Sequence, residues 1–179
     1  MEKRIKLHDM SFKIFISEEQ IKEKVKEIAN RINNDYAGKN PTLLVVLKGG
    51  MIFASDLMRE ITIGCSLDII SAKSYGSEME SSGSVALKHF DNDFTNKDII
   101  IVEDIIDTGL TIKTLKEDIL KHNPASLEVA SFLSKPEART VNVDIKYVGY
   151  EIPKFFVVGY GLDYAEFGRE LKDIYILAD

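Results

Sequence analysis

Near the N-terminus of this chain, apolar residues recur at the spacing of one helix face, at positions Ile21, Val25, Ile28 and Ile32. Residues 17–20, Ser-Glu-Glu-Gln, match a capping box, in which a serine and a glutamine bind each other's backbone N–H groups. The sequence therefore predicts an amphipathic helix that begins behind Ser17. The turn-forming residues of segment 33–41 are expected to end it.

Further along, apolar residues occur in continuous runs that are too short for helices and fit strands buried on both faces of a sheet. Strands are predicted at 43–47, 67–75, 84–90, 99–102, 127–133, 147–150, 155–160 and 174–177. Helices are predicted between them at 51–61 and 111–121. This alternation predicts an α/β fold with a parallel-sheet core and helices on both faces. In such sheets ligands bind at the carboxyl ends of the strands.

The strongest candidate for an anion site is the phosphate turn, residues 107–111, with the sequence Asp-Thr-Gly-Leu-Thr. It leads into the predicted helix, so unpaired backbone N–H groups and the helix dipole would face a ligand. Gly109 permits a close approach of the backbone, and Thr108 and Thr111 add hydroxyl donors. These properties suit a phosphate monoester.

Glu103 and Asp104 follow the apolar strand 99–102, just before the phosphate turn. Carboxylates would repel a phosphate, but they suit sugar hydroxyls or a hydrated divalent cation. Taken singly, such acids are more often solvated surface residues, and a turn of this kind is often only a helix cap. Their combination at the functional edge of the sheet favours a ribose 5-phosphate site.

The segment 102–109, Val-Glu-Asp-Ile-Ile-Asp-Thr-Gly, resembles the phosphoribosyl pyrophosphate loop of the type I phosphoribosyltransferases, in particular their hypoxanthine-guanine branch. The resemblance extends from Leu43 to the C-terminus. It implies a single phosphoribosyltransferase domain over residues 1–179, with a core at about 36–135 and a small hood from about 1–16 and 137–179. It also implies a purine salvage enzyme that transfers 5-phosphoribosyl to N9 of hypoxanthine or guanine. The products would be IMP or GMP and pyrophosphate.

The resemblance gives roles to two further loops. Leu47, Lys48 and Gly49 would belong to the family's pyrophosphate loop, in which the Leu-Lys peptide is often cis. Ser74 and Tyr75 would open the flexible loop that closes over the site and excludes water. From their residues alone, the first loop is either a small anion nest or a turn, and the second is a hairpin tip.

The purine pocket is also assigned by resemblance. Lys135 would donate to the 6-oxo group, Phe156 would stack on the purine, and the backbone of Val157 would read its edge. Asp163 would be a Mg²⁺ ligand, and Arg169 would contact pyrophosphate. Without the resemblance, Lys135 fits a solvated lysine equally well, and the segment around Phe156 fits a core strand.

Asp107 is the residue we expect to be catalytic, as the general base that handles the purine N7 proton. It stands in the phosphate turn but would repel a phosphate, so its carboxylate must point elsewhere. Mg²⁺ and the pyrophosphate loop would neutralise the leaving group. Leu110 departs from the family pattern, because some relatives carry a basic residue there. Only backbone contacts to the phosphate are expected at that position.

Composition and charge narrow the class of protein. The chain is 45% hydrophobic and 29% charged, as in soluble globular domains, and a net charge of −6 disfavours non-specific nucleic-acid binding. The single cysteine, Cys65, cannot form an intrachain disulfide, and the three histidines show no metal-ligand spacing. No apolar run approaches the ~20 residues of a membrane helix, and no secretory signal is visible. A cytoplasmic location and no membrane partner are expected.

Three other functions are compatible with parts of this pattern. A non-catalytic nucleotide- or RNA-binding regulator on the same fold would retain the binding loops, but the acidic net charge and Asp107 argue against it. A phosphoacceptor receiver domain would use Glu103 and Asp104, but it leaves the phosphate turn unexplained. An adenine-specific transferase is disfavoured by Lys135. By resemblance, the transferase is expected to form a homodimer or homotetramer.

Overall fold

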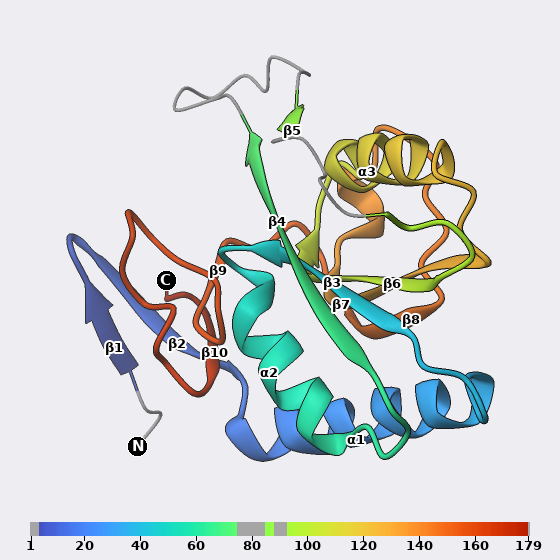
Figure 1. Ribbon diagram of the computed structural model, residues 1–179. Helices are drawn as coiled ribbons and strands as arrows, with labels where there is room; N and C mark the ends of the chain where they lie inside the picture. The colour runs from blue at the N-terminus through green and yellow to red at the C-terminus, as the bar shows by residue number, and fades with distance from the viewer. Residues whose placement is uncertain (1–3, 75–84, 88–92, 179) are drawn as a thin grey trace.

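The computed structural model describes residues 4–74, 85–87 and 93–178, which form two sheets and three α-helices. The larger sheet has the order β5-β4-β3-β6-β7-β8 (Figure 1). Five of its strands pair in parallel, and β5 pairs antiparallel to β4. The strands are β3 (Thr42–Leu47), β4 (Ser66–Ser74), β5 (Val85–Leu87), β6 (Asp98–Ile106), β7 (Ser126–Ser134) and β8 (Tyr147–Glu151). The predicted parallel α/β sheet is confirmed.

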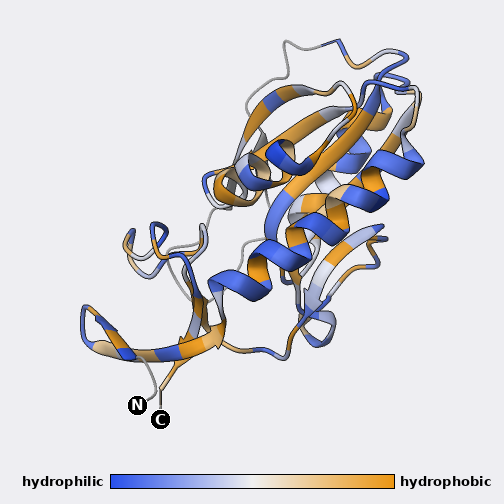
Figure 2. Ribbon diagram, turned by 90° about the horizontal axis from the view of Figure 1, so that it is seen from below, coloured by the Kyte–Doolittle hydropathy of each residue, from blue (hydrophilic) through white to orange (hydrophobic). Residues whose placement is uncertain are grey.

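Helices pack against both faces of this sheet. Successive side chains of β3 point to opposite faces, so each face presents apolar residues to the helices that cover it. Its Leu43 and Val45 join the cluster formed with α1 (Glu18–Asp35) and α2 (Gly50–Glu60). Its Leu44 and Val46 join the cluster on the other face, formed with α3 (Leu110–Leu120). Figure 2 shows the result, with largely hydrophobic strands beside helices that carry alternating hydrophobic and hydrophilic bands.

Helix α1 has the predicted start and the predicted buried face. The Ser17 side chain accepts a hydrogen bond from the backbone N–H of Gln20, and the Gln20 side chain accepts one from the backbone N–H of Ser17. The capping box is therefore confirmed. The four predicted core positions are at most 2% exposed: Ile21, Val25, Ile28 and Ile32.

A smaller antiparallel sheet is built from both ends of the chain and lies beside the larger one (Figure 1). Its order is β1-β2-β10-β9. The strands are β1 (Arg4–Leu7), β2 (Met10–Ile16), β9 (Val157–Val158) and β10 (Ile174–Leu177). It has a hydrophobic cluster of its own, centred on Phe12, Val158 and Tyr175. Among the described residues, no helix is long and apolar enough to cross a membrane.

Three boundaries differ from the expectations. Strand β6 continues past Val102 to Ile106, because its partner β7 also continues and the two pair as far as Ile106 and Ser134. Strand β8 pairs with β7, so the larger sheet extends beyond the core expected at about 36–135. Strand β9 has only two residues instead of the 155–160 predicted, because β10 pairs with only two positions of that segment. Residues 75–84 and 88–92, which include the expected loop, lie outside the described residues.

Candidate active site

The phosphate turn connects the end of β6 to the start of α3. Gly109 caps the helix with a φ of +84°, a left-handed conformation that glycine adopts readily. The Thr108 hydroxyl accepts a hydrogen bond from the backbone N–H of Leu110 at 3.4 Å. The turn borders a cavity of about 290 Å³, lined by Glu103, Ile105, Ile106, Asp107, Thr108, Gly109, Thr111 and Ile112. The expected anion site is therefore concave and lies at the carboxyl edge of the sheet.

The segment after β7 supports the phosphate turn from behind. The backbone N–H groups of Thr140 and Val141 donate to the Thr108 carbonyl oxygen at 3.1 and 3.4 Å. A Cβ at Gly109 would lie 3.0 Å from a methyl group of Val143. The backbone conformation at position 109 therefore favours glycine, and a larger residue would also crowd Val143.

Glu103 and Asp104 lie within β6 and not after it, and they are only 8% and 9% exposed. Burial raises the pKa of both carboxyls, and the neighbouring Asp104 charge raises the pKa of Glu103 further. Backbone N–H groups of Asp104 and Ile105 donate to these carboxyls at 3.2 and 2.8 Å. Two desolvated acids without a bound cation make an electrostatically unfavourable arrangement, which a cation would relieve.

Gly49 lies directly against Asp104. A Cβ at Gly49 would lie 1.8 Å from Asp104 Oδ2, so no larger residue fits without displacing the carboxylate. On the other side, a Cβ at Gly161 would lie 2.4 Å from the Gly49 carbonyl oxygen. The Leu47-Lys48 peptide beside this contact is cis, as the resemblance implied. Gly161 was not a predicted site residue, although the close pair Gly159 and Gly161 signals a tight backbone approach.

One ion pair lies within the loop that follows β9, and a second joins this loop to Lys48. The Arg169 guanidinium lies 2.6 Å from Asp163 Oδ1, and it also donates to the Gly161 carbonyl at 2.6 Å. The Lys48 ammonium donates to Glu166 Oε2 at 2.8 Å. Among the described residues, Arg169 Nε is buried and has no hydrogen-bond partner. Glu166 was missed by the sequence reasoning, because its contact depends on a loop more than a hundred residues away in the chain.

Lys135 lies beside Asp107, with Nζ 2.9 Å from Oδ1. The lysine side chain is 12% exposed and the aspartate side chain 49%. The backbone N–H of Lys135 donates to the Ile106 carbonyl at 3.0 Å, which holds the lysine next to the end of β6. The Asp107 carboxylate is therefore turned toward the predicted purine lysine.

The other predicted residues are distributed around this centre. Phe156 is 46% exposed, and Val157, on β9, is 6% exposed. Ser74 ends β4, and Tyr75 lies outside the described residues. The structure thus brings Gly49, Asp104 and the loop after β9 into contact, whereas it does not describe the part of the closing loop that Tyr75 would begin.

Metal binding at this site would depend on more than the protein side chains that the structure describes. Among residues 4–74, 85–87 and 93–178, no group of three or more His, Cys, Asp or Glu side chains is arranged to hold a metal. Mg²⁺ does not require one, because it usually keeps several waters and binds through one or two carboxylates and substrate phosphates. The two desolvated acids of β6 fit that mode of binding.

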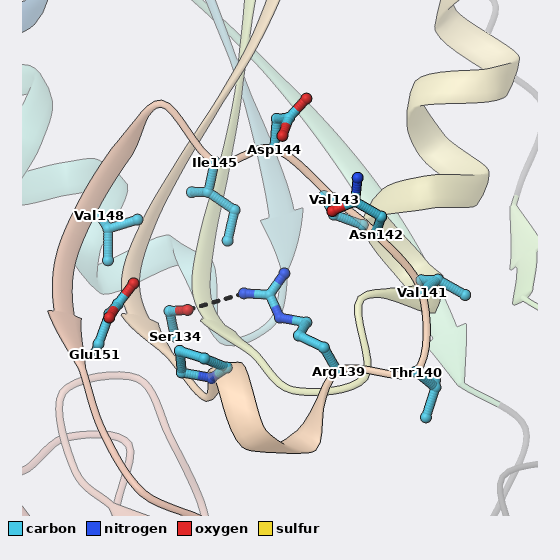
Figure 3. A pocket seen from close by; sticks show the side chains of 11 residues that line it. Ser134, Arg139, Thr140, Val141, Asn142, Val143, Asp144, Ile145, Val148 and Glu151 are labelled. Carbon is cyan, nitrogen blue, oxygen red and sulfur yellow. Dashed lines mark hydrogen bonds between the residues drawn. The ribbon is translucent and has the colours of Figure 1, made fainter.

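A larger cavity, of about 510 Å³, lies under the segment after β7 (Figure 3). The Arg139 side chain points into it, and its guanidinium donates to the Ser134 hydroxyl at 2.8 Å. Ser134 is the residue before Lys135, so Arg139 supports the end of the strand that carries the predicted purine lysine. No sequence pattern predicts this contact.

Comparisons with known proteins agree with one another. The chain matches the family described as phosphoribosyl transferase domain over residues 16–165. A hypoxanthine-guanine phosphoribosyltransferase of Streptococcus mutans is 44% identical over 169 residues, which cover 93% of this chain and 93% of that protein. A hypoxanthine-guanine phosphoribosyltransferase of Aquifex aeolicus is 40% identical over 169 residues, which cover 93% of this chain and 95% of that protein. The structure is similar to a crystal structure of a Bacillus anthracis hypoxanthine-guanine phosphoribosyltransferase with HEPES in its active site. The two chains are 44% identical and superpose with a TM-score of 0.87, and the match covers 97% of this chain and 100% of the Bacillus chain.

Proposed function

The chain belongs to the hypoxanthine-guanine phosphoribosyltransferases, and we propose that it acts in purine salvage by transferring 5-phosphoribosyl from phosphoribosyl pyrophosphate to N9 of hypoxanthine or guanine. The products are IMP or GMP and pyrophosphate. The family match over residues 16–165 and the relatives at 40–44% identity support this assignment.

The observation that carries the proposal is the ion pair between Lys135 and Asp107 next to the phosphate turn. A lysine ammonium only donates hydrogen bonds. It can therefore bind a 6-oxo group of a purine but not a 6-amino group, whose N–H groups also donate. An aspartate beside it is within reach of the adjacent ring nitrogen, N7. One pair of side chains therefore accounts for the choice of base and for the handling of its proton.

The phosphate turn holds the 5′-phosphate of the ribosyl donor. Backbone N–H groups at the start of α3 and the hydroxyls of Thr108 and Thr111 supply the donors. Glu103 borders the same cavity and accepts hydrogen bonds from ribose hydroxyls. These contacts fix the anomeric carbon relative to the purine, so that bond breaking and bond making occur in line.

The leaving group is held at Lys48, Gly49 and Arg169. Both cations are paired with acids of this chain, Lys48 with Glu166 and Arg169 with Asp163. Pyrophosphate offers each cation a doubly charged oxygen cluster in place of a single carboxylate. Binding of the donor therefore exchanges internal ion pairs for contacts with the departing pyrophosphate, which stabilises its developing charge.

Mg²⁺ is the metal that these acids suit, and Glu103, Asp104 and Asp163 are the residues that would hold it. It supplies charge neutralisation of the pyrophosphate group. Burial raises the pKa of both β6 acids, and a bound cation would favour their ionised forms.

The other partners follow from this activity and from the family. Phosphoribosyl pyrophosphate, a 6-oxopurine and the nucleoside monophosphate are the ligands, and nucleic acid and membranes are not partners. We assign a homodimer or homotetramer and a cytoplasmic location on the basis of the family.

A product assay tests the proposal. The protein is incubated with Mg²⁺ and phosphoribosyl pyrophosphate, and hypoxanthine, guanine, xanthine, adenine, uracil and orotate are offered separately. Chromatography of the products is expected to reveal IMP and GMP, without AMP, UMP or orotidine monophosphate. If a nucleotide binds but no base is converted, the enzyme assignment fails and a regulatory binding protein on this fold replaces it.

A further inference from the structure

The hairpin formed by β1 and β2 reaches the candidate active site although it precedes the region matched by the family. The family match begins at residue 16, and the hairpin occupies residues 4–16. Its two-residue turn, His8 and Asp9, contacts the loop that carries Asp163 and Arg169. The hairpin therefore lies before the matched region but contacts a loop of the candidate site.

Asp9 and Tyr164 form the polar part of this contact. The Tyr164 hydroxyl donates to Asp9 Oδ1 at 2.9 Å. The hydrogen bond lowers the pKa of Asp9 and raises the pKa of Tyr164, so the pair consists of a carboxylate and a neutral phenol around neutral pH. His8 packs edge-on against the rings of Tyr164 and Phe167, with centroids 5.5 and 4.8 Å away.

Apolar packing fixes the same contact. A Cβ at Gly168 would lie 2.9 Å from Leu7 Cδ1, so the loop and the hairpin touch without a gap. Leu7 and Tyr164 both pack on the cluster centred on Phe12, Val158 and Tyr175. Tyr164 therefore has its ring in a hydrophobic cluster and its hydroxyl held by the hairpin turn.

Tyr164 in turn supports the residue that stacks on the purine. Its ring lies edge-on to Phe156, with centroids 5.7 Å apart and an interplanar angle of 87°. Phe12 of the hairpin is tilted against Phe156 at 6.1 Å. Phe156 remains 46% exposed, so one part of its surface is held by these two rings while another part stays available to a base.

From these contacts we propose that Asp9 and Tyr164 are positioning residues of the purine pocket, in which the Asp9–Tyr164 hydrogen bond fixes the Tyr164 ring against Phe156. This inference rests on the proposed function, because it assumes that Phe156 stacks on the purine. Neither residue touches the reacting atoms. Both act through Phe156, and the hairpin turn supports the base site by holding Tyr164 in place.

Loss of the hydrogen bond should affect the purine more than the ribosyl donor. Arg169 pairs with Asp163 and donates to the Gly161 carbonyl, and neither contact involves Tyr164. Phe156, by contrast, contacts Tyr164 directly. The predicted signature is therefore a higher KM for hypoxanthine with an almost unchanged KM for phosphoribosyl pyrophosphate.

A double-mutant cycle with Asp9→Ala and Tyr164→Phe tests the proposal. Each variant is expected to raise the KM for hypoxanthine about three- to tenfold, the range that corresponds to one hydrogen bond. The double variant is expected to resemble either single variant, because both substitutions remove the same bond. Tyr150→Phe is the matched control, since its hydroxyl also donates a hydrogen bond, to the Gln20 carbonyl, in a different part of the protein.

Equilibrium binding of IMP, measured by calorimetry on the same variants, separates this inference from the proposed function. It requires no turnover, so a weaker affinity for IMP in Asp9→Ala and Tyr164→Phe supports the positioning role even if no transfer activity is found. The inference is overturned if both variants bind IMP and hypoxanthine as the wild type does. It is equally overturned if the two effects multiply in the double variant, because the residues would then act independently.

Discussion

Lys135 Nζ lies 2.9 Å from Asp107 Oδ1, which joins the end of β7 to the phosphate turn after β6. The lysine side chain is almost fully buried, whereas half of the aspartate side chain is accessible. A 6-oxopurine placed beside this pair would meet the ammonium at its oxygen and the carboxylate at its neighbouring ring nitrogen. Recognition of the base and movement of its proton are thus assigned to one ion pair.

Replacement of Lys135 by methionine should weaken the use of 6-oxopurines. Lys135→Met keeps the length of the side chain but removes the donor. We expect kcat/KM for hypoxanthine to fall about 10- to 100-fold, because a hydrogen bond from a charged group contributes about 1.5–3 kcal/mol. The preference for hypoxanthine over adenine, measured as a ratio of kcat/KM values, should shrink accordingly.

Lys121→Met is the control for that experiment, because Lys121 forms a similar ion pair with Asp118 at the far end of α3. It should leave both kinetic constants unchanged. An unaltered ratio of hypoxanthine to adenine in Lys135→Met would show that another group selects the base.

Substitution of Gly49 by alanine should damage the site through Asp104. The added methyl group would lie 1.8 Å from Asp104 Oδ2, and the buried carboxylate has little room to move. We expect a loss of stability of about 1–3 kcal/mol, as for other overpacked positions, together with a strong loss of transfer activity. Chemical unfolding and steady-state kinetics measure the two effects.

Gly38→Ala is the control for Gly49→Ala, because it should lower stability without affecting the site. Gly38 has a φ of +77°, and a Cβ there would meet no heavy atom within 4 Å. Alanine at this position should cost about 1–2 kcal/mol of stability through backbone strain and leave kcat unchanged. If both glycine variants lost activity to the same extent, the contact between Gly49 and Asp104 would have no special role.

The buried acids of β6 should make the metal-free protein less stable as pH rises. Their pKa values are raised in the folded state. At a pH above the ordinary carboxyl pKa of ~4, the folded protein therefore binds more protons than the unfolded chain does. Stability is therefore lost as pH increases from that range through the raised pKa values. Thermal unfolding between pH 5 and 8, with and without a chelator, measures the slope.

Asp104→Asn should flatten this pH dependence and raise the Tm of the metal-free protein near neutral pH. One kcal/mol corresponds to about 2–4 °C in a domain of this size. Mg²⁺ with pyrophosphate should raise the Tm of the wild type more than that of the variant. A variant with the same pH slope as the wild type would contradict the assignment of this slope to Asp104.

Features that depend on local sequence were predicted well. The capping box at Ser17, the buried face of α1 and the turn at Gly109 that leads into α3 each arise from residues close together in the chain. The parallel sheet followed from apolar runs long enough to be buried on both faces.

Features that depend on distant partners were not predicted from periodicity. The length of β6 is set by its pairing with β7. Two contacts of the site join segments far apart in the chain, namely Gly49 with Asp104 and Lys48 with Glu166. The purine pocket was assigned only by family resemblance, because from sequence alone Phe156 fits an ordinary strand residue and Lys135 a surface lysine. The hairpin contact of Asp9 with Tyr164 had no sequence signal.

The central claim is that Asp107 handles the purine proton, and the kinetics of Asp107→Asn test it most directly. With hypoxanthine, Mg²⁺ and phosphoribosyl pyrophosphate, kcat for IMP formation is predicted to fall by about 10²–10⁴-fold, the contribution typical of a general base. Binding of phosphoribosyl pyrophosphate, measured in parallel by calorimetry, should be nearly unchanged. A variant that forms IMP as fast as the wild type would contradict the catalytic role of Asp107.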